Sequence, residues 1–360
     1  MLSHKLVSMG FRICSYDKCV AIRSSVGLIV CFHVDDLFIA AKSMKSRDDF
    51  ISDFGKIFKI THKTGDELDY LGMRIVFKNG GIIIDQHAFV AKLVEGVTGT
   101  VTTPALPVDQ EIYDDTPLDA GDTTNFRSKV AKCLYLAKRS RPDILYAVNM
   151  LARASQAPRV TDRDRLQRLL KFLNFTRGRV LRLQANGLRL NAYIDAAFAT
   201  HGDRRSHTGA FICVGGALIW AKSVKQSIVT KSSTEAELVA LSDMTSMLLW
   251  ASMLMAELGY LHMNGKPIAH QDNQSTMSIV QKGSSASERT RHIDTRFLWM
   301  KELLDNGKLE LSYCPTDEMV ADVLTKALSA EKFAKFAKKM SIDVANDYTR
   351  VINTLLDPYR

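Results

Sequence analysis

The alternation of apolar and polar residues over 188–194 predicts a β-strand that ends on Asp195. Two more strands follow it closely, and helical and strand patterns then alternate along the chain. The predicted strands cover 189–195, 208–214, 217–222, 267–271 and 308–313, and the predicted helices cover 234–258, 274–282 and 291–305, with one more starting near 317. This order predicts an α/β fold of mixed α+β type, in which helices flank a five-stranded mixed sheet.

The N-terminal part of the chain has the pattern of two apolar hairpins joined by short helices. The first hairpin pairs a strand over 27–34 with a strand that starts at Leu37, and Asp35 and Asp36 form its turn. The second hairpin covers 71–85 and turns at an Asn-Gly-Gly sequence, which is a strong hairpin signal. The helices expected here cover 2–11, a segment capped by Ser46, and 88–95.

The middle of the chain begins with a proline-rich stretch over 98–123, which predicts a linker or an extended crossing segment. Helical patterns follow it. Pro142 suits the first turn of one helix, and Thr161 is the expected N-cap of the next. The helices predicted here and near the C-terminus cover 125–138, 142–154, 161–176 and 330–340.

The chain has 46% apolar and 24% charged residues, as expected for a globular protein of two or three domains. Its net charge of +9 is concentrated in one region. Residues 127–179 hold 14 Lys or Arg against 3 Asp, a balance of +11, so the remaining residues carry −2. This basic helical region favours a polyanionic partner, although a solvated helix face would have the same composition.

Neither a membrane span nor a signal peptide is expected. No uninterrupted apolar run reaches about 18 residues, and the first residues lack an apolar segment. The six cysteines are scattered without a CxxC pair, which favours reduced thiols in an intracellular protein over disulfides or a zinc site.

Four carboxylates occur where they can meet at the end of the first strand of the predicted sheet. Asp195 ends that strand, Glu237 lies early in a long helical pattern, Asp272 follows a short strand, and Asp322 lies in a further helical turn. Clustered carboxylates repel one another, so such a group persists mainly when cations neutralise it. The sequence therefore predicts a two-metal phosphodiesterase site.

Each of these acids also has a plain structural interpretation. Asp195 would simply end a strand, Asp272 would cap its helix, and Asp322 would lie on a polar helix face. Glu237 competes with Glu235, because the two point about 200° apart on a helix and only one can face the sheet. Glu237 is preferred for its Ala-Glu-Leu-Val-Ala-Leu context, and Glu235 would then be a first-turn acid favoured by the helix dipole.

Ten motifs, in order and with consistent spacing over nearly the whole chain, give it a specific resemblance. They are Val34-Asp-Asp-Leu, Tyr70-Leu-Gly-Met, Leu134-Tyr-Leu-Ala, Arg141-Pro-Asp-Ile-Leu-Tyr-Ala-Val, Tyr193-Ile-Asp-Ala-Ala-Phe-Ala, Asp203-Arg-Arg-Ser-His-Thr-Gly, Lys231-Ser-Ser-Thr-Glu-Ala-Glu-Leu, Asp272-Asn-Gln-Ser, Arg291-His-Ile-Asp and Ala321-Asp-Val-Leu-Thr-Lys. The chain resembles the C-terminal part of the copia-type LTR-retrotransposon Pol polyprotein, which comprises the later reverse transcriptase palm, a connecting region and an RNase H domain.

The resemblance implies hydrolysis of the RNA strand of an RNA–DNA hybrid, with two Mg²⁺ or Mn²⁺ ions as cofactors. Carried over by motif, Asp195, Glu237 and Asp272 would be the core metal ligands and Asp322 would complete the catalytic set. His292 and Asp294 match a motif without an assigned role. The implied domains are a partial palm over 1–98, a linker with a basic thumb-like connection over 99–180, an RNase H-like domain over 181–329 and a tail over 330–360.

The polymerase half departs from the family pattern. Asp35 and Asp36 would be the remainder of a metal site, because the third palm aspartate and the fingers are not found in this sequence. RNA-directed DNA polymerase activity is therefore not expected from this chain alone. In the RNase H half, Ala197 and Phe198 stand where the family usually has an acid and a tryptophan, which affects local packing and rate rather than the four candidate ligands.

Three interpretations follow from the resemblance. The first is a metal-dependent RNase H-type endoribonuclease attached to an incomplete reverse transcriptase. The second is an inactive retroelement remnant that only binds nucleic acid, and the third is a subunit completed by a separate polymerase chain. The expected partners are an RNA–DNA hybrid and other retroelement proteins, without a membrane. The location is either a cytoplasmic virus-like particle or the nucleus.

Overall fold

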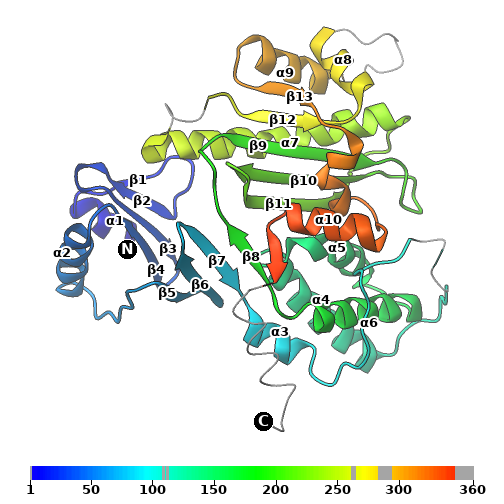
Figure 1. Ribbon diagram of the computed structural model, residues 1–360, viewed down its shortest axis with the longest axis horizontal. Helices are drawn as coiled ribbons and strands as arrows, with labels where there is room; N and C mark the ends of the chain where they lie inside the picture. Colours follow the sequence, from blue (N-terminus) through cyan, green and yellow to red (C-terminus); the bar gives the residue numbers. More distant parts are fainter. Residues whose placement is uncertain (1, 108–109, 111–112, 261–264, 283–293, 345–360) are drawn as a thin grey trace.

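The computed structural model describes residues 2–107, 110, 113–260, 265–282 and 294–344. Its central feature is a five-stranded sheet with the order β11-β10-β9-β12-β13 (Figure 1). Strand β10 runs antiparallel to both β9 and β11, whereas β12 runs parallel to both β9 and β13. The strands are β9 (Leu190–Ala197), β10 (His207–Val214), β11 (Ala217–Lys225), β12 (Ile268–Gln271) and β13 (Glu310–Tyr313). The predicted α/β fold class with a five-stranded mixed sheet is confirmed.

Both faces of this sheet are covered, because its strands carry apolar residues on both sides. Along β10, Ala210 and Ile212 pack in one core with the long helix α7 (Ser233–Met255), whereas Phe211 and Cys213 pack in a second core. That second core also contains the buried faces of three helices from the basic region. They are α4 (Ala120–Ala137), α5 (Leu145–Ala154) and α6 (Val160–Phe175).

Helix α7 and its continuation to Tyr260 form the one segment, within the described residues, that is long and apolar enough to cross a membrane. Half of its most apolar stretch is buried inside the protein. Its apolar residues pack on β9 and β10 and against helices α8 (Gln274–Lys282) and α9 (Asp294–Asp305). The packing explains the composition as that of a core helix.

Two further sheets contain the strands of the N-terminal region. One has the order β1-β2-β3-β4, and its helices α1 (Leu2–Ser8) and α2 (Met44–Gly55) close a separate small core. The other has the order β14-β8-β7-β6-β5 and is followed in the chain by helix α3 (His87–Leu93) after β7. The strands are β1 (Arg12–Ile13), β2 (Val20–Arg23), β3 (Leu28–His33), β4 (Asp36–Ala41), β5 (Glu67–Tyr70), β6 (Met73–Lys78), β7 (Gly81–Asp85), β8 (Arg179–Leu183) and β14 (Ile342–Val344).

The second of these sheets joins distant parts of the chain. Strand β8 pairs with β7 on one side and with the C-terminal β14 on the other, both antiparallel. Strands from the segments predicted as palm, RNase H-like domain and tail therefore share one sheet (Figure 1). The predicted domain boundaries remain predictions, and this sheet shows that the segments are packed together.

Three local predictions were wrong. Ser43, not Ser46, caps α2, because the Ser43 hydroxyl accepts the Ser46 N–H. Thr161 lies inside α6, which starts after Arg159, and its hydroxyl instead bonds with the backbone of Asp114. The helix expected from 317 is a pair of short 3₁₀ turns, η7 (Thr316–Glu318) and η8 (Val320–Leu324), followed by helix α10 (Ala330–Lys339). The helix predicted over 291–305 is observed as α9 from Asp294 onward, and residues 291–293, with His292 among them, lie outside the described residues.

The Arg141-Pro-Asp motif has a structural role. The Arg141 guanidinium forms two hydrogen bonds to the Asp143 carboxylate, at 2.9 and 2.8 Å, and bonds to both the carbonyl and the hydroxyl of Thr176. Both charged side chains are almost fully buried, where an unpaired charge would be costly. Pro142 lies in the first turn that follows, as predicted, so this motif joins the end of α4 to the end of α6.

Candidate metal centre

Asp195 lies near the end of β9 with its carboxylate fully enclosed. It is directly opposite Gly209 in the register between β9 and β10, where the absence of a side chain leaves room for the η8 turn. The Thr325 hydroxyl, just after η8, donates a hydrogen bond to Asp195 Oδ2. The central strand therefore holds this acid at the junction between the sheet and η8.

Helix α7 presents Glu237, and not Glu235, to this junction. Ser232 caps the helix and accepts the backbone N–H of Glu235, while the Glu235 carboxylate accepts the backbone N–H of Lys231. Glu235 is thereby used in a reciprocal cap, a common device at helix starts. Glu237, two residues further, lies in the acidic cluster, which agrees with the interpretation preferred from the sequence.

Asp272 follows β12 directly and lies next to the same junction. Its Oδ2 accepts a hydrogen bond from the Thr316 hydroxyl at 2.9 Å. Asn273, and not Asp272, caps helix α8, because the Asn273 side chain accepts the Thr276 N–H at 3.0 Å. The capping interpretation of Asp272 is therefore wrong, and its carboxylate is left facing the cluster.

The oxygen atoms of Asp195, Glu237 and Asp272 lie within 4.8 Å of one another. Carboxylate oxygens bound to one octahedral Mg²⁺ lie about 3 to 4 Å apart, so small side-chain rotations fit these three acids to a hard divalent ion. Three convergent carboxylates of this type, two of them buried, are a donor set suited to Mg²⁺ or Mn²⁺.

The electrostatics of the cluster show the cost of holding these acids together. Burial, followed by the charge of Asp322, raises the pKa of Asp195 to about 7. Burial and the charges of Asp195 and Asp272 raise the pKa of Glu237 well above its usual value. A cation placed between these acids would lower both pKa values and relieve the repulsion.

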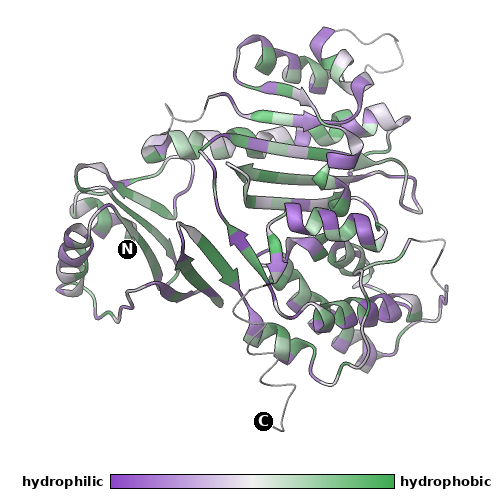
Figure 2. Ribbon diagram, in the orientation of Figure 1, coloured by the Kyte–Doolittle hydropathy of each residue, from purple (hydrophilic) through white to green (hydrophobic). Residues whose placement is uncertain are grey.

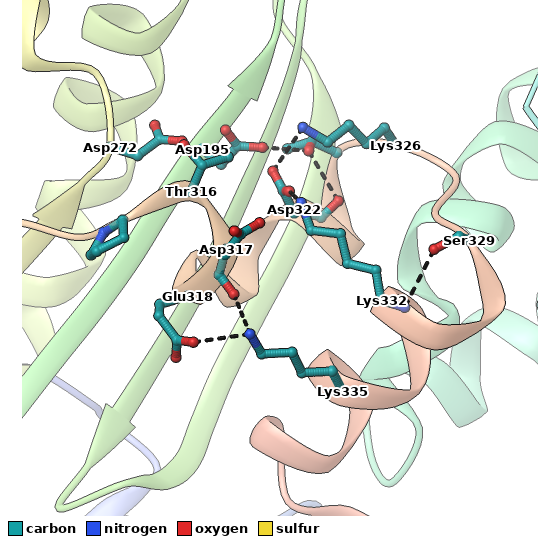
Figure 3. Close-up of polar contacts among 12 residues, drawn as sticks. Asp195, Asp272, Thr316, Asp317, Glu318, Asp322, Lys326, Ser329, Lys332 and Lys335 are labelled. Atoms are coloured by element: carbon teal, nitrogen blue, oxygen red, sulfur yellow. Dashed lines mark hydrogen bonds and ion pairs between the residues drawn. The ribbon is translucent and has the colours of Figure 1, made fainter.

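Asp322, the fourth predicted ligand, is next to the cluster but is not part of it. It lies on η8, is fully buried, and pairs with the ammonium groups of Lys326 and Lys332 (Figure 3). Burial opposes the charged form of Lys326, but the carboxylates of Asp195 and Asp322 outweigh it and raise the pKa of this lysine. The structure thus brings three of the four predicted acids together and places two lysines beside the fourth.

A buried glutamine in the site was not singled out from the sequence. The Gln271 side chain donates a hydrogen bond to Glu237 Oε2 at 3.2 Å, and its carbonyl accepts the backbone N–H groups of Asp272 and Asn273 at 2.8 and 3.0 Å. It is fully buried, so it joins one candidate ligand to the backbone of another. Gln271 lies at the end of β12, directly before Asp272, and this position in the sequence is the signal that could have identified it.

Asp35 and Asp36 lie far from this cluster in the fold, at the tip of the β3–β4 hairpin in another sheet. Both side chains are exposed, and they border a groove of about 920 Å³ between β4, α2 and β5. Among the residues that the structure describes, no cluster of three potential ligands includes them. Whether the pair is the remainder of a metal site stays a prediction.

The fold and the acidic cluster define a mixed α/β protein with a candidate metal centre at the end of its central strand. Its N-terminal region, residues 1–109, matches the family described as reverse transcriptase (RNA-dependent DNA polymerase). Most of the chain is similar to curated Pol polyproteins of copia-type retrotransposons, as the sequence resemblance indicated.

Two of these relatives are from plants. The Pol polyprotein of transposon RE1 from Arabidopsis thaliana is 30% identical over 86% of this chain, and that of transposon TNT 1-94 from Nicotiana tabacum is 29% identical over 85%. The chain spans only 21% and 24% of the length of these two polyproteins. Among solved structures, RNase H1 from Halobacterium salinarum is similar over 38% of this chain and 94% of its own, with 19% identity and a TM-score of 0.27.

Proposed function

We propose that this chain is a divalent-metal-dependent endonuclease of the RNase H type, which hydrolyses the RNA strand of RNA–DNA hybrids. The observation that carries the proposal is the convergence of Asp195, Glu237 and Asp272 at the end of the central strand. The relation to retrotransposon Pol polyproteins supports it. A divalent ion held there would supply the Lewis-acid chemistry of phosphodiester hydrolysis.

The protein's own residues have defined roles in this proposal. Asp195, Glu237 and Asp272 hold the ion and remain ionised in its presence. Gln271 orients Glu237 relative to the backbone that follows β12, so two of the ligands keep a fixed separation. Fixed geometry of this kind reduces the reorganisation needed when the ion and the substrate bind.

The basic helices α4 to α6 supply the substrate-binding charge in the proposal. They pack on the same face of the central sheet as η8, which carries Asp322 beside the cluster. Their exposed cations would contact phosphates of the nucleic acid and make binding weaken as the salt concentration rises. The exposed basic residues of this region are Arg127, Lys132, Lys138, Arg153, Arg163 and Arg177.

The test is cleavage of an RNA–DNA hybrid, labelled on the RNA strand, in Mg²⁺ or Mn²⁺. We expect the wild type to cut the hybrid and Asp195→Asn and Glu237→Gln to lose about 100-fold or more of the rate, because each removes a ligand charge. Glu235→Gln is the matched control, since Glu235 caps α7 and should keep cleavage near the wild-type rate.

Double-stranded DNA of the same sequence tests the substrate class. Equal cutting of this duplex would point to a less selective nuclease. If folded wild-type protein binds the hybrid but cuts nothing with either ion, the endonuclease proposal is wrong and the nucleic-acid-binding remnant is favoured. If hybrid cleavage persists in Asp195→Asn, the assigned site is wrong.

A further inference from the structure

Two lysines surround the fourth acid of the site. Lys326 Nζ lies 2.8 Å from Asp322 Oδ1, and Lys332 Nζ lies 2.7 Å from Asp322 Oδ2 (Figure 3). The Asp322 carboxylate is fully buried, so these two ammonium groups are its charged partners in place of water. A carboxylate paired in this way on both oxygens has little charge left to attract a metal ion.

The charge balance favours a single divalent ion. The four carboxylates, Asp195, Glu237, Asp272 and Asp322, carry −4 when ionised, and the two lysines carry +2, which leaves −2. In the absence of substrate, one divalent ion neutralises that charge, whereas two would leave a net +2 in a site where three of the four acids are buried. The expected set of two ions and four carboxylate ligands therefore does not fit this arrangement, although three ligands and one ion do.

The fold holds Lys332 in place through helix α10. The Ser329 hydroxyl caps this helix by accepting the Lys332 N–H, and Lys335 binds Glu318 on η7 at 2.9 Å (Figure 3). Lys339 also pairs with Glu318, and strand β14 then pairs with β8. Figure 2 shows hydrophilic bands along α10. The position of Lys332 is thus fixed at several points.

Lys326 has a different setting. It is tethered four residues from Asp322 on the same segment, and its side chain is 43% exposed, against 30% for Lys332. Its ammonium group lies against Asp322, and its side chain is less enclosed than that of Lys332. A cation in this position can contact a non-bridging phosphate oxygen and stabilise the charge that develops there during hydrolysis.

We propose that the site binds one divalent ion, through Asp195, Glu237 and Asp272, and that Lys326 supplies the second positive charge to the scissile phosphate. Lys332 neutralises Asp322 and keeps it as the partner of Lys326. Lys326 stays protonated throughout and transfers no proton. This inference rests on the proposed nuclease function, but its central claim concerns how many ions the protein binds.

The experiment counts Mn²⁺ ions bound to the protein without substrate, by electron paramagnetic resonance of the free ion. We expect one Mn²⁺ per wild-type chain, and none at the same concentration in Asp195→Asn. Lys326→Gln should gain a second, weaker site, because Asp322 then loses one of its two cations. Its hybrid cleavage should fall about 10- to 100-fold, with partial rescue in Lys326→Arg.

Lys338→Gln is the matched control, since Lys338 is an exposed lysine of the same helix that takes no part in the ion pairs of Asp322 or Glu318, and its loss should leave the ion count at one. Circular dichroism melting verifies that each variant is folded. The second variant is Lys332→Gln, which also exposes Asp322 to a cation. Two tight ions in the wild type, or an unchanged count and cleavage rate in Lys326→Gln, would overturn the inference. A single ion with no cleavage would refute the nuclease proposal while leaving the charge assignment intact.

Discussion

At the scale of single residues, Asp195 should make the stability of the metal-free protein depend on pH. Its pKa is raised to about 7 by burial and by Asp322, whereas the same carboxyl in an unfolded chain has a pKa of about 4. Between these values the folded state holds a proton that the unfolded state releases. The free energy of unfolding should therefore fall as the pH rises through this window and level off above it.

The variant Asp195→Asn isolates this effect, because asparagine does not ionise. In EDTA, we expect its melting temperature to exceed that of the wild type, with a difference that grows from pH 5 to pH 8. Saturating Mg²⁺ should reduce or reverse the difference, since the ion binds the ionised wild-type site and stabilises it. A difference that stays constant with pH in EDTA would contradict the assignment.

Gln271 gives a second residue-scale prediction. Its amide donates to Glu237 while its carbonyl accepts two backbone N–H groups, so Gln271→Ala leaves several buried polar groups without a partner. We expect a loss of about 1 to 3 kcal/mol of stability and a 10- to 100-fold weaker affinity for Mn²⁺, measured by calorimetry. Gln271→Glu should be worse for stability, because it adds a fourth carboxylate to the cluster. Unchanged Mn²⁺ affinity in Gln271→Ala would show that Glu237 is oriented by other contacts.

At the scale of elements, β10 and η8 pack closely at Gly209. A Cβ atom on Gly209 would lie 2.7 Å from Thr325 Cγ2 and 2.8 Å from both the Ala321 carbonyl oxygen and Leu324 Cβ. Gly209→Ala should therefore push η8 away from β10, cost about 1 to 3 kcal/mol of stability and lower hybrid cleavage by displacing the segment beside Asp195. Thermal melting and the cleavage assay measure the two effects.

Gly202→Ala is the control for that prediction. A Cβ on Gly202 would meet no atom within 4 Å, and its backbone does not need the left-handed conformation that favours glycine. This substitution should leave both stability and cleavage close to the wild type. Equal losses in the two variants would mean that the contact between β10 and η8 is not what Gly209 protects.

Some elements near this junction and elsewhere could not be predicted from the sequence pattern. Strands β9 to β13 and helix α7, which is apolar nearly all round, were expected within a few residues of their observed bounds. The η8 turn is buried on every side by contacts that include β10 and α10, and η7 consists of three exposed polar residues, so neither has an apolar stripe that would predict a helix. Strand β14 is only three residues long and owes its conformation to pairing with β8, a partner about 160 residues earlier.

The site itself was predictable in part, for a related reason. Asp195, Glu237 and Asp272 follow from local motifs at a strand end, a helix start and a second strand end, and the parallel pairing of β9 with β12 brings these places together. The pairing of Asp322 with two lysines could not be predicted in this way. It depends on the position of α10, which the sequence indicates only as an isolated helix.

At the scale of the whole molecule, the two sets of acids belong to different sheets. Asp35 and Asp36 are exposed on the β3–β4 hairpin, whereas Asp195 lies on the central sheet, and no group of three potential metal ligands among the described residues combines the two sets. A polymerase needs a full metal site and a surface that holds the template and the nucleotide. We therefore expect no primer extension on an RNA template by this chain, under conditions in which it cuts a hybrid.

Hybrid cleavage in the same buffer serves as the positive control, because it shows that the protein is folded and has its metal ion. The double variant Asp35→Asn, Asp36→Asn should cleave the hybrid at the wild-type rate, since neither side chain contacts the candidate metal centre. Primer extension by the wild type that disappears in this double variant would show that the hairpin acids form a working polymerase site. Reduced cleavage in the double variant would instead show that the hairpin takes part in binding the hybrid, and that the two sheets act on one substrate.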